Sequence, residues 1–300
     1  MTDQKIISVF APAKINLFLH LTRKMQNGYH ALQSLISFAD IGDLIEIEPA
    51  DQFSLSIKGP FASYFKEQEH HSAVGSSNLV VKAARALAQN ADKPLNVKIT
   101  LTKNLPLAAG IGGGSSDAAA TLWGLQQLWG LDRNAPYLLP LMTKLGADVP
   151  VCMHCQPTLV EGIGEKLLQA PNMPEIPILI VNPLVSCPTA EIFMNHHGLF
   201  KDKITLPDNF ATVFELVDFL RTTQNDLYAP AAQLVPEIGN VLNALDADTQ
   251  CLLSRMTGSG ASSFALFETI ESAHNAQKII QDENPDWWAK VGWLNRPERY

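Results

Sequence analysis

The most chemically suggestive part of the chain is the segment Gly110–Ser116, in which four glycines precede two serines. Glycine has no Cβ, so its backbone adopts positive φ easily and lets a ligand come close. A helix that begins directly after such a loop presents unpaired N–H groups and the positive end of its dipole, which together bind phosphate. Because a strand pattern and helix-capping residues flank the segment, we favour a phosphate-binding loop over a flexible connector.

The flanking residues predict the elements that position this loop. Apolar side chains alternate from Leu95 to Leu101, which is typical of a β-strand. From Ala118 to Trp129 they recur at helical spacing, and Gly130 stands where a helix commonly ends. Ser115–Asp117 is the expected N-cap and first turn of that helix.

The loop fits neither of two common nucleotide-binding patterns. The P-loop pattern requires a lysine after the glycines, and none follows here. The dinucleotide pattern would require a glycine at position 115, which is a serine. The segment alone therefore predicts a phosphate site without identifying the nucleotide.

A polar pair near the start of the chain is a second candidate. Lys14 and Asn16 follow Pro12 in a predicted strand, and their spacing places both on one face with Phe18 and His20. On the pattern alone we favour a half-exposed strand whose polar face is solvated. The alternative is that both polar side chains reach one ligand.

A third candidate is Asp148, which stands in the turn Gly146–Pro150. A lone aspartate in such a turn is usually a turn or capping residue, so the pattern by itself does not indicate catalysis. Cys152 and Cys155 follow as a C-x-x-C pair without a second pair or a histidine ligand. They predict small buried side chains and no metal site.

The composition excludes several classes of protein. With 46% hydrophobic and 17% charged residues, the 300-residue chain can bury a large core. Its net charge of −8 argues against a protein that binds nucleic acid or an anionic membrane. No apolar run approaches the ~20 residues of a membrane span, and the first residues lack the pattern of a secretory signal. With four cysteines we expect reduced thiols and a cytoplasmic location. No obligate protein partner is evident from the sequence.

Strands and helices alternate along the chain, which predicts an α+β protein of two domains with a boundary near Pro157. We expect residues 5–21 to form two strands that are separated by a break at 11–13. A second glycine-serine turn spans Arg255–Ser263. Further expected elements are strands at 44–48, 53–58, 160–164 and 176–181 and helices at 78–89, 136–145, 211–221, 236–246 and 271–282, with another helix opening near Pro188.

Three separated segments together resemble the three motifs of the GHMP kinases, the superfamily of galactokinase, homoserine kinase and mevalonate kinase. They are Pro12–Leu17, Pro106–Ala119 and Met256–Ala261. The resemblance implies a two-domain GHMP kinase fold, with an N-terminal ATP-binding domain over residues 1–157 and a C-terminal α/β substrate domain over residues 158–300. The active site is then expected in the cleft between the domains.

Within the superfamily, three further segments resemble the family that phosphorylates 4-diphosphocytidyl-2-C-methyl-D-erythritol. They are Gly28–Gln33, Gly112–Asp117 and Gly146–Pro150. The implied reaction moves the γ-phosphate of ATP to the 2-hydroxyl, giving the 2-phosphate and ADP, in the non-mevalonate (methylerythritol phosphate) route to isoprenoids. The alternatives are a GHMP kinase for another small alcohol, such as homoserine or a mevalonate derivative, and a regulatory nucleotide-binding protein without catalysis.

The resemblance also implies roles for single residues. Asp148 corresponds to the catalytic base and Lys14 to its cationic partner, while Asn78, Leu79 and Lys103 match positions that line the adenine pocket. The residues expected to hold the triphosphate are Pro106, Leu107, Ala108, Ala109, Gly110, Ile111, Gly112, Gly113, Gly114, Ser115 and Ser116. The third motif consists of Thr257, Gly258, Ser259, Gly260 and Ala261. We infer Mg²⁺ from the need to neutralise ATP, with either Ser115 or Ser116 facing it.

The expected substrate is a small molecule with a cytidine diphosphate group. Tyr29 and Phe193 match aromatic residues that sandwich cytosine, where stacking contributes ~1–3 kcal/mol per base. His30 is expected to contact the cytosine edge, and Asn16 and Thr189 the methylerythritol or phosphate part. The alternative for Phe193 is a core position on an amphipathic helix. Residues 59–75 and 198–209 match no motif.

Overall fold

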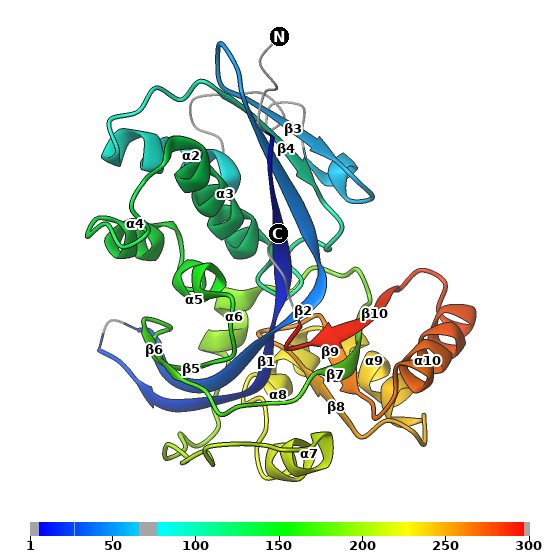
Figure 1. The fold of residues 1–300 in the computed structure, drawn as a ribbon. Helices are drawn as coiled ribbons and strands as arrows, with labels where there is room; N and C mark the ends of the chain where they lie inside the picture. Colours follow the sequence, from blue (N-terminus) through cyan, green and yellow to red (C-terminus); the bar gives the residue numbers. More distant parts are fainter. Residues whose placement is uncertain (1–5, 27, 66–76, 297–300) are drawn as a thin grey trace.

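Two long antiparallel strands, β1 (Ile7–Lys24) and β2 (His30–Pro49), form the spine of the molecule (Figure 1). The computed structural model describes residues 6–26, 28–65 and 77–296. The two strands pair from Ile7↔Ile47 to Lys24↔His30. They therefore extend from one end of the molecule to the other and can hold residues that are far apart.

The first half of the chain builds a sheet around β2. The second part of β2 pairs with β4 (Val97–Thr102), which pairs in parallel with β3 (Ser54–Lys58). The first part of β2 pairs with β5 (Thr158–Gly162), and β5 pairs with β6 (Lys166–Gln169). In Figure 1 four helices gather on one side of this sheet: α2 (Leu79–Asn90), α3 (Gly113–Trp129), α4 (Leu138–Leu145) and α5 (Val149–His154).

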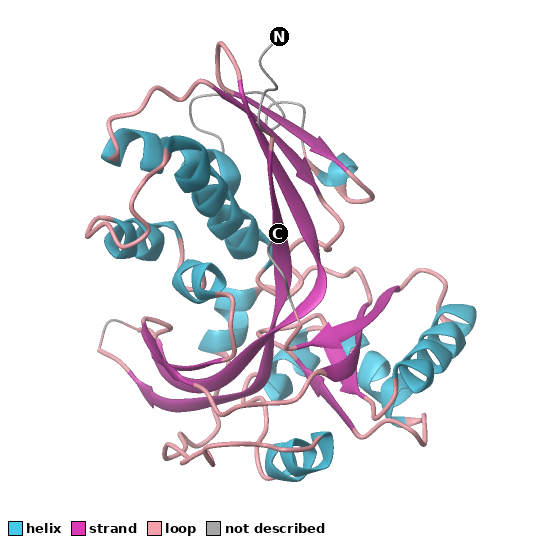
Figure 2. Cartoon of the chain, in the orientation of Figure 1, coloured by secondary structure: helices cyan, strands magenta, loops and turns pink. Residues whose placement is uncertain are grey.

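The second half of the chain builds a smaller group of strands beside the lower part of the long β1–β2 pair, as drawn in Figure 2. Its central strand, β7 (Ile176–Asn182), is buried at all seven positions and pairs with β10 (Trp288–Leu294) and β9 (Ser263–Leu266). β8 (Leu253–Met256) pairs with β9, and β10 meets β2 at Leu294↔Ala39. The helices of this half are α6 (Thr189–Met194), α7 (Val213–Arg221), α8 (Tyr228–Leu234), α9 (Glu237–Asp246) and α10 (Ile270–Glu283).

The largest apolar cluster lies under the four helices of the first half. It includes Val9 on β1, Ile45 on β2, Leu87 on α2 and Leu122 on α3. Burying a side chain of this size contributes about 1.5–3 kcal/mol, so the cluster fixes α3 firmly against the long strands. This packing matters because the N-terminus of α3 follows the glycine loop.

The beginning of the chain differs from the sequence-based prediction. Residues 7–24 form one strand without a break, because a register shift between Pro12 and Lys14 accommodates the proline. The prediction of a solvated polar face is also wrong, since Lys14, Asn16 and His20 are only 4%, 3% and 2% exposed. Both faces of β1 are covered, one by α3 and the other by apolar residues of the second half.

The capping predictions were right in part. Asn78 caps α2 as expected, with its side chain accepting from Val80 N at 2.9 Å. Gly130 ends α3 in the left-handed conformation, also as expected. The start of α3 was predicted too late, because left-handed Gly112, rather than Ser115–Asp117, precedes the first helical residue. A glycine in that conformation turns the loop directly into the helix.

Other elements bear on the remaining expectations. β2 begins at His30, well before the strand predicted at 44–48, since pairing with β1 continues through residues whose apolar pattern does not alternate. α4 begins two residues after Pro136, and α5, α8 and β6 were not anticipated. Cys152 and Cys155 are buried, as expected. In the described part of the chain no helix is both long and apolar enough for a membrane span. The domain boundary near Pro157 stays a prediction.

Candidate active site

Lys14 and Asp148 lie together although they are far apart in the sequence. Lys14 Nζ is 3.1 Å from Asp148 Oδ2, and it also donates to Asn16 Oδ1 at 3.1 Å. Lys14 comes from the buried strand β1 and its side chain is 5% exposed, whereas the Asp148 side chain is 42% exposed. Asp148 precedes α5 without capping it, so its carboxylate is free to face the adjoining pocket. The pair combines a fixed cation with an accessible proton acceptor.

Two pockets meet at the glycine loop. The large pocket has a volume of about 800 Å³, and Lys14 and Asp148 line it. The small pocket has a volume of about 410 Å³ and is lined by residues 106–110 and 112–115 of the loop and its approach. Gly110, Gly112 and Ser115 line both, so a ligand in one pocket can reach a ligand in the other across this point.

The small pocket contains most of the residues expected to bind ATP. Those that line it are Asn78, Leu79, Lys103, Pro106, Leu107, Ala108, Ala109, Gly110, Gly112, Gly113, Gly114 and Ser115, together with Phe65, Leu101 and Asp117. Two expected residues do not line it. Ile111 packs in the apolar core, and only its carbonyl contributes, accepting from Lys14 N at 2.9 Å. Ser116 is 1% exposed, and its Oγ has no hydrogen-bond partner among the described residues.

The second and third motifs interlock through their glycines. Gly110 has φ of +72°, and a Cβ there would lie 2.5 Å from Gly260 O. Gly258 has φ of +57°, and a Cβ there would overlap Gly110 O. Ser262 N also donates to Ala109 O at 3.2 Å. The backbone of the third motif therefore packs directly against the backbone of the glycine loop, and the two segments approach so closely that only glycine fits.

The first motif joins the same junction. Asn16 N donates to Thr257 Oγ1 at 2.8 Å, and Asn16 Nδ2 donates to Ser34 Oγ at 2.8 Å. Because Asn16 also accepts from Lys14, its side chain already has partners at both ends. Asn16 lines the large pocket, and its protein contacts orient Lys14.

The remaining third-motif residues divide between lining and support. Gly258 and Ser259 line the large pocket, and Ser259 Oγ is 2.7 Å from Thr189 Oγ1. Thr257 and Ala261 are fully buried. Thr189 and Phe193 both belong to α6 and line the pocket, so the contact with Ser259 places the start of α6 beside the third motif.

Aromatic rings gather at the far end of the large pocket. Tyr29, His30 and Phe193 all line it, with Tyr29 62% exposed. The ring centroids of His30 and Phe193 are 5.8 Å apart. Two residues that the sequence analysis missed complete the group: His196 lies 6.3 Å and Phe200 6.0 Å from His30, centroid to centroid. The clustering of aromatic residues and histidines just after Phe193 was the signal that could have found them.

His30 is suited to hydrogen bonding as a neutral ring. Burial lowers its pKa from the usual value, and interaction with Lys24 and with His196 lowers it further. A neutral imidazole has one donating and one accepting nitrogen, which can match the edge of a nucleobase. The far end of the pocket therefore combines stacking surfaces with a polar edge.

Comparison with known proteins agrees with this arrangement. Residues 78–156 match the family model of the GHMP kinases N terminal domain, and residues 214–286 that of the GHMP kinases C terminal. A 4-diphosphocytidyl-2-C-methyl-D-erythritol kinase of Paramagnetospirillum magneticum is 43% identical over 283 residues, which are 94% of this chain and 96% of the relative. The kinase of that name from Cereibacter sphaeroides is 44% identical over 284 residues, or 93% and 96% of the two chains.

Solved structures give the same picture. The crystal structure of 4-(cytidine 5'-diphospho)-2C-methyl-D-erythritol kinase is similar with a TM-score of 0.77 and 29% identity, covering 97% of this chain and all of that one. A homoserine kinase from Cytophaga hutchinsonii has a TM-score of 0.68 and 18% identity, covering 99% of this chain and 96% of that one. The second likeness shows the fold alone. The expected α+β fold class is confirmed.

Proposed function

Because the chain belongs to the GHMP kinases, and within them to the 4-diphosphocytidyl-2-C-methyl-D-erythritol kinase family, we infer that it phosphorylates that alcohol with ATP. The γ-phosphate moves to the 2-hydroxyl, and the products are the 2-phosphate and ADP. The reaction is a step of the non-mevalonate (methylerythritol phosphate) route to isoprenoid precursors. The enzyme is thus a small-molecule kinase.

The observation that carries the mechanism is the contact between Lys14 and Asp148 beside the junction of the two pockets. A phosphoryl group held at the glycine loop and a hydroxyl held in the large pocket meet there. In the proposed step, a bond forms between the hydroxyl oxygen and the γ-phosphorus, and the bond from that phosphorus to the bridging oxygen of ADP breaks. Asp148 takes the hydroxyl proton, and Lys14 keeps Asp148 in place and stabilises charge on the reacting oxygens.

The loop supplies what a lysine supplies in P-loop enzymes. Its backbone and the N-terminus of α3 present N–H groups and a positive dipole end to the triphosphate. Asn78 and Leu79, at the start of α2, line the same small pocket and are assigned to the nucleoside part of ATP. Phosphoryl transfer depends mainly on such positioning and charge neutralisation.

We assign Mg²⁺ to the junction on the basis of its chemistry. In the described ranges, no three His, Cys, Asp or Glu side chains gather as metal ligands. That fits an ion held mainly by phosphate oxygens and water, with few protein groups. Ser115, which lines both pockets, is the residue proposed to face it. Bound there, the ion neutralises charge on the phosphates.

The cytidyl part of the substrate is assigned to the aromatic end of the large pocket. Tyr29 and Phe193 are proposed to stack on cytosine, and neutral His30 to bond its edge. Homoserine and mevalonate have no base to occupy this end. The alternative of another small alcohol is therefore not favoured.

A coupled ADP-release assay tests the function. The purified chain is offered ATP with the diphosphocytidyl alcohol, homoserine or mevalonate in separate reactions. Turnover with the cytidyl substrate alone supports the inference. Turnover only with homoserine or mevalonate would overturn it, and ATP binding without any turnover would favour a regulatory protein.

A further inference from the structure

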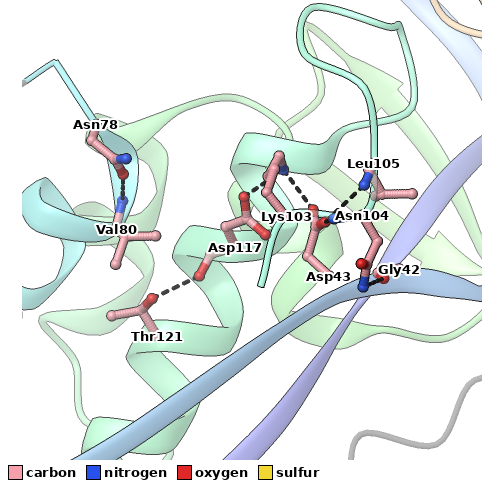
Figure 3. A network of polar contacts seen from close by, with 9 residues as sticks. All are labelled: Gly42, Asp43, Asn78, Val80, Lys103, Asn104, Leu105, Asp117 and Thr121. Atoms are coloured by element: carbon pink, nitrogen blue, oxygen red, sulfur yellow. Dashed lines mark hydrogen bonds and ion pairs between the residues drawn. The ribbon is translucent and has the colours of Figure 1, made fainter. Parts of the chain in front are cut away.

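Both ends of the glycine loop are attached to one buried ion cluster, which consists of Asp43, Lys103 and Asp117 (Figure 3). Lys103 Nζ lies 2.5 Å from Asp43 Oδ2 and 2.7 Å from Asp117 Oδ2. None of the three side chains is more than 5% exposed. Buried charges of this kind are costly unless each is paired, so the geometry of the cluster is tightly constrained.

The first attachment is at the start of the loop. Asp43 Oδ1 accepts from Asn104 N at 2.6 Å and from Leu105 N at 2.9 Å. The Asn104 side chain donates back to Gly42 O at 3.1 Å. A single carboxylate on β2 therefore holds the backbone where the chain leaves β4 and enters the loop.

The second attachment is at the end of the loop. Asp117 lies near the start of α3, and Lys103 connects its carboxylate to that of Asp43. The separation between Leu105 and the N-terminus of α3 is thus set through three charged side chains. The middle of the loop is held separately, by Lys14 N donating to Ile111 O and by Ser262 N donating to Ala109 O.

The charge state of the cluster suits an anionic ligand nearby. Burial raises the pKa of Asp117 to about 8, with Lys103 opposing the rise and Asp43 adding to it. Burial lowers the pKa of Lys103, but the two carboxylates outweigh burial and raise it overall. With its pKa raised, Lys103 is an ammonium, and its positive charge offsets negative charge on the carboxyls, which lessens the repulsion of phosphate.

We propose that Asp43 and Asp117 are positioning residues for ATP, which act through Lys103 to hold the two ends of the glycine loop at the separation that the triphosphate requires. Neither aspartate has a role in the proton transfer assigned above. Lys103 lines the small pocket, but its ammonium group contacts both carboxylates, so its main effect on ATP is through the loop. The proposal rests on the proposed function only in taking ATP as the ligand of the loop.

The test uses Asp43→Asn and Asp117→Asn, which keep the side-chain shape and replace one carboxyl oxygen by an NH₂ group, which cannot accept a hydrogen bond from Lys103. Asp218→Asn is the matched control, because Asp218 forms an exposed ion pair with Arg221 on α7, 3.0 Å long. Binding of ATP to each variant is measured by calorimetry without the alcohol, and KM is measured for both substrates. We expect ATP to bind about tenfold more weakly in both cluster variants, since charged hydrogen bonds are lost, while KM for the alcohol stays within about twofold.

Unchanged ATP affinity in folded cluster variants would overturn the proposal, and so would an equal loss for both substrates. Circular dichroism checks folding. If Asp43→Asn does not fold, Asp117→Asn decides, because it leaves both backbone bonds of Asp43 in place. The calorimetric test measures ATP binding and needs no turnover. If the wild-type chain binds ATP but does not phosphorylate the cytidyl alcohol, the proposed function is refuted, and the positioning role of the cluster can still be tested.

Discussion

The ring of Phe200 lies 6.0 Å from that of His30, centroid to centroid, with 32° between the ring planes. Phe200 belongs to a segment between α6 and α7 in which no motif was recognised. His30 starts β2 and lines the large pocket. The contact places a late segment of the chain against the residue that is proposed to bond cytosine.

Replacing Phe200 by alanine should weaken binding of the cytidyl substrate. An aromatic pair contributes about 0.5–1.5 kcal/mol, which corresponds to a rise in KM of about threefold to tenfold. KM for ATP and kcat should change little. Phe214→Ala is the control, because Phe214 on α7 is similarly exposed, 46% against 43%. An unchanged KM for the cytidyl alcohol would show that Phe200 does not support His30.

Replacing Asp148 by asparagine should abolish most turnover while ATP still binds. General base catalysis contributes about 10²–10⁴-fold, so kcat should fall by that order. Steady-state kinetics gives kcat, and calorimetry gives the ATP affinity. Asp286→Asn, at an exposed site before β10, should behave as wild type. A nearly normal kcat in Asp148→Asn would exclude this residue as the base.

Replacing Gly110 by alanine should destabilise the protein and the loop together. The new Cβ would lie 2.5 Å from Gly260 O at φ of +72°, so the backbone must shift. Strain of this kind costs about 1–3 kcal/mol, visible as a lower Tm in thermal unfolding. Gly239→Ala on α9, where a Cβ meets nothing within 4 Å, should leave Tm equal or higher. Equal Tm values for Gly110→Ala and wild type would contradict the interlocked arrangement.

Stability should depend on pH through Asp117. Its pKa rises from 3.8 to about 8 in the folded protein, because of burial and Asp43 and despite Lys103. Between these values the unfolded chain loses the proton and the folded chain keeps it, so stability falls as pH rises through the window. Titration of a single proton changes the free energy of unfolding by at most about 1.4 kcal/mol per pH unit.

The measurement for that prediction is Tm from pH 5 to pH 8 for wild type and Asp117→Asn. The variant lacks the titrating group, so its Tm should exceed that of wild type increasingly as pH rises. Parallel curves would show that Asp117 does not hold a proton in the folded state. Asp218→Asn should run parallel to wild type.

Local patterns in the sequence predicted the elements around the glycine loop and most helices of the second half. These patterns reflect interactions between near neighbours, such as the cap of Asn78 on Val80 and the left-handed end at Gly130. The roles of Lys14 and Asp148 came only from the resemblance to GHMP kinases. Their contact depends on how α5 packs against α3 and how α3 packs against β1, and no local pattern encodes it.

Two parts of the site could not be predicted for similar reasons. Asp43 is one of several acidic residues in a strand whose early part has no regular alternation, so nothing in the sequence marked it as a partner of Lys103. Phe200 lies in a segment without motif or helical pattern, and only the folded chain brings it to His30. Burial on both faces of β1 was missed because the strand is covered by residues from far along the chain.

The glycine loop is backed by chain that comes more than a hundred residues later, through Gly258 and Gly260 against Gly110. A shortened polypeptide that ended before the third motif would keep every loop residue but would lack this backing. The nucleotide site is therefore completed only when the last third of the polypeptide has been made and has folded. During synthesis, ATP binding should emerge late and together with the cleft that uses it.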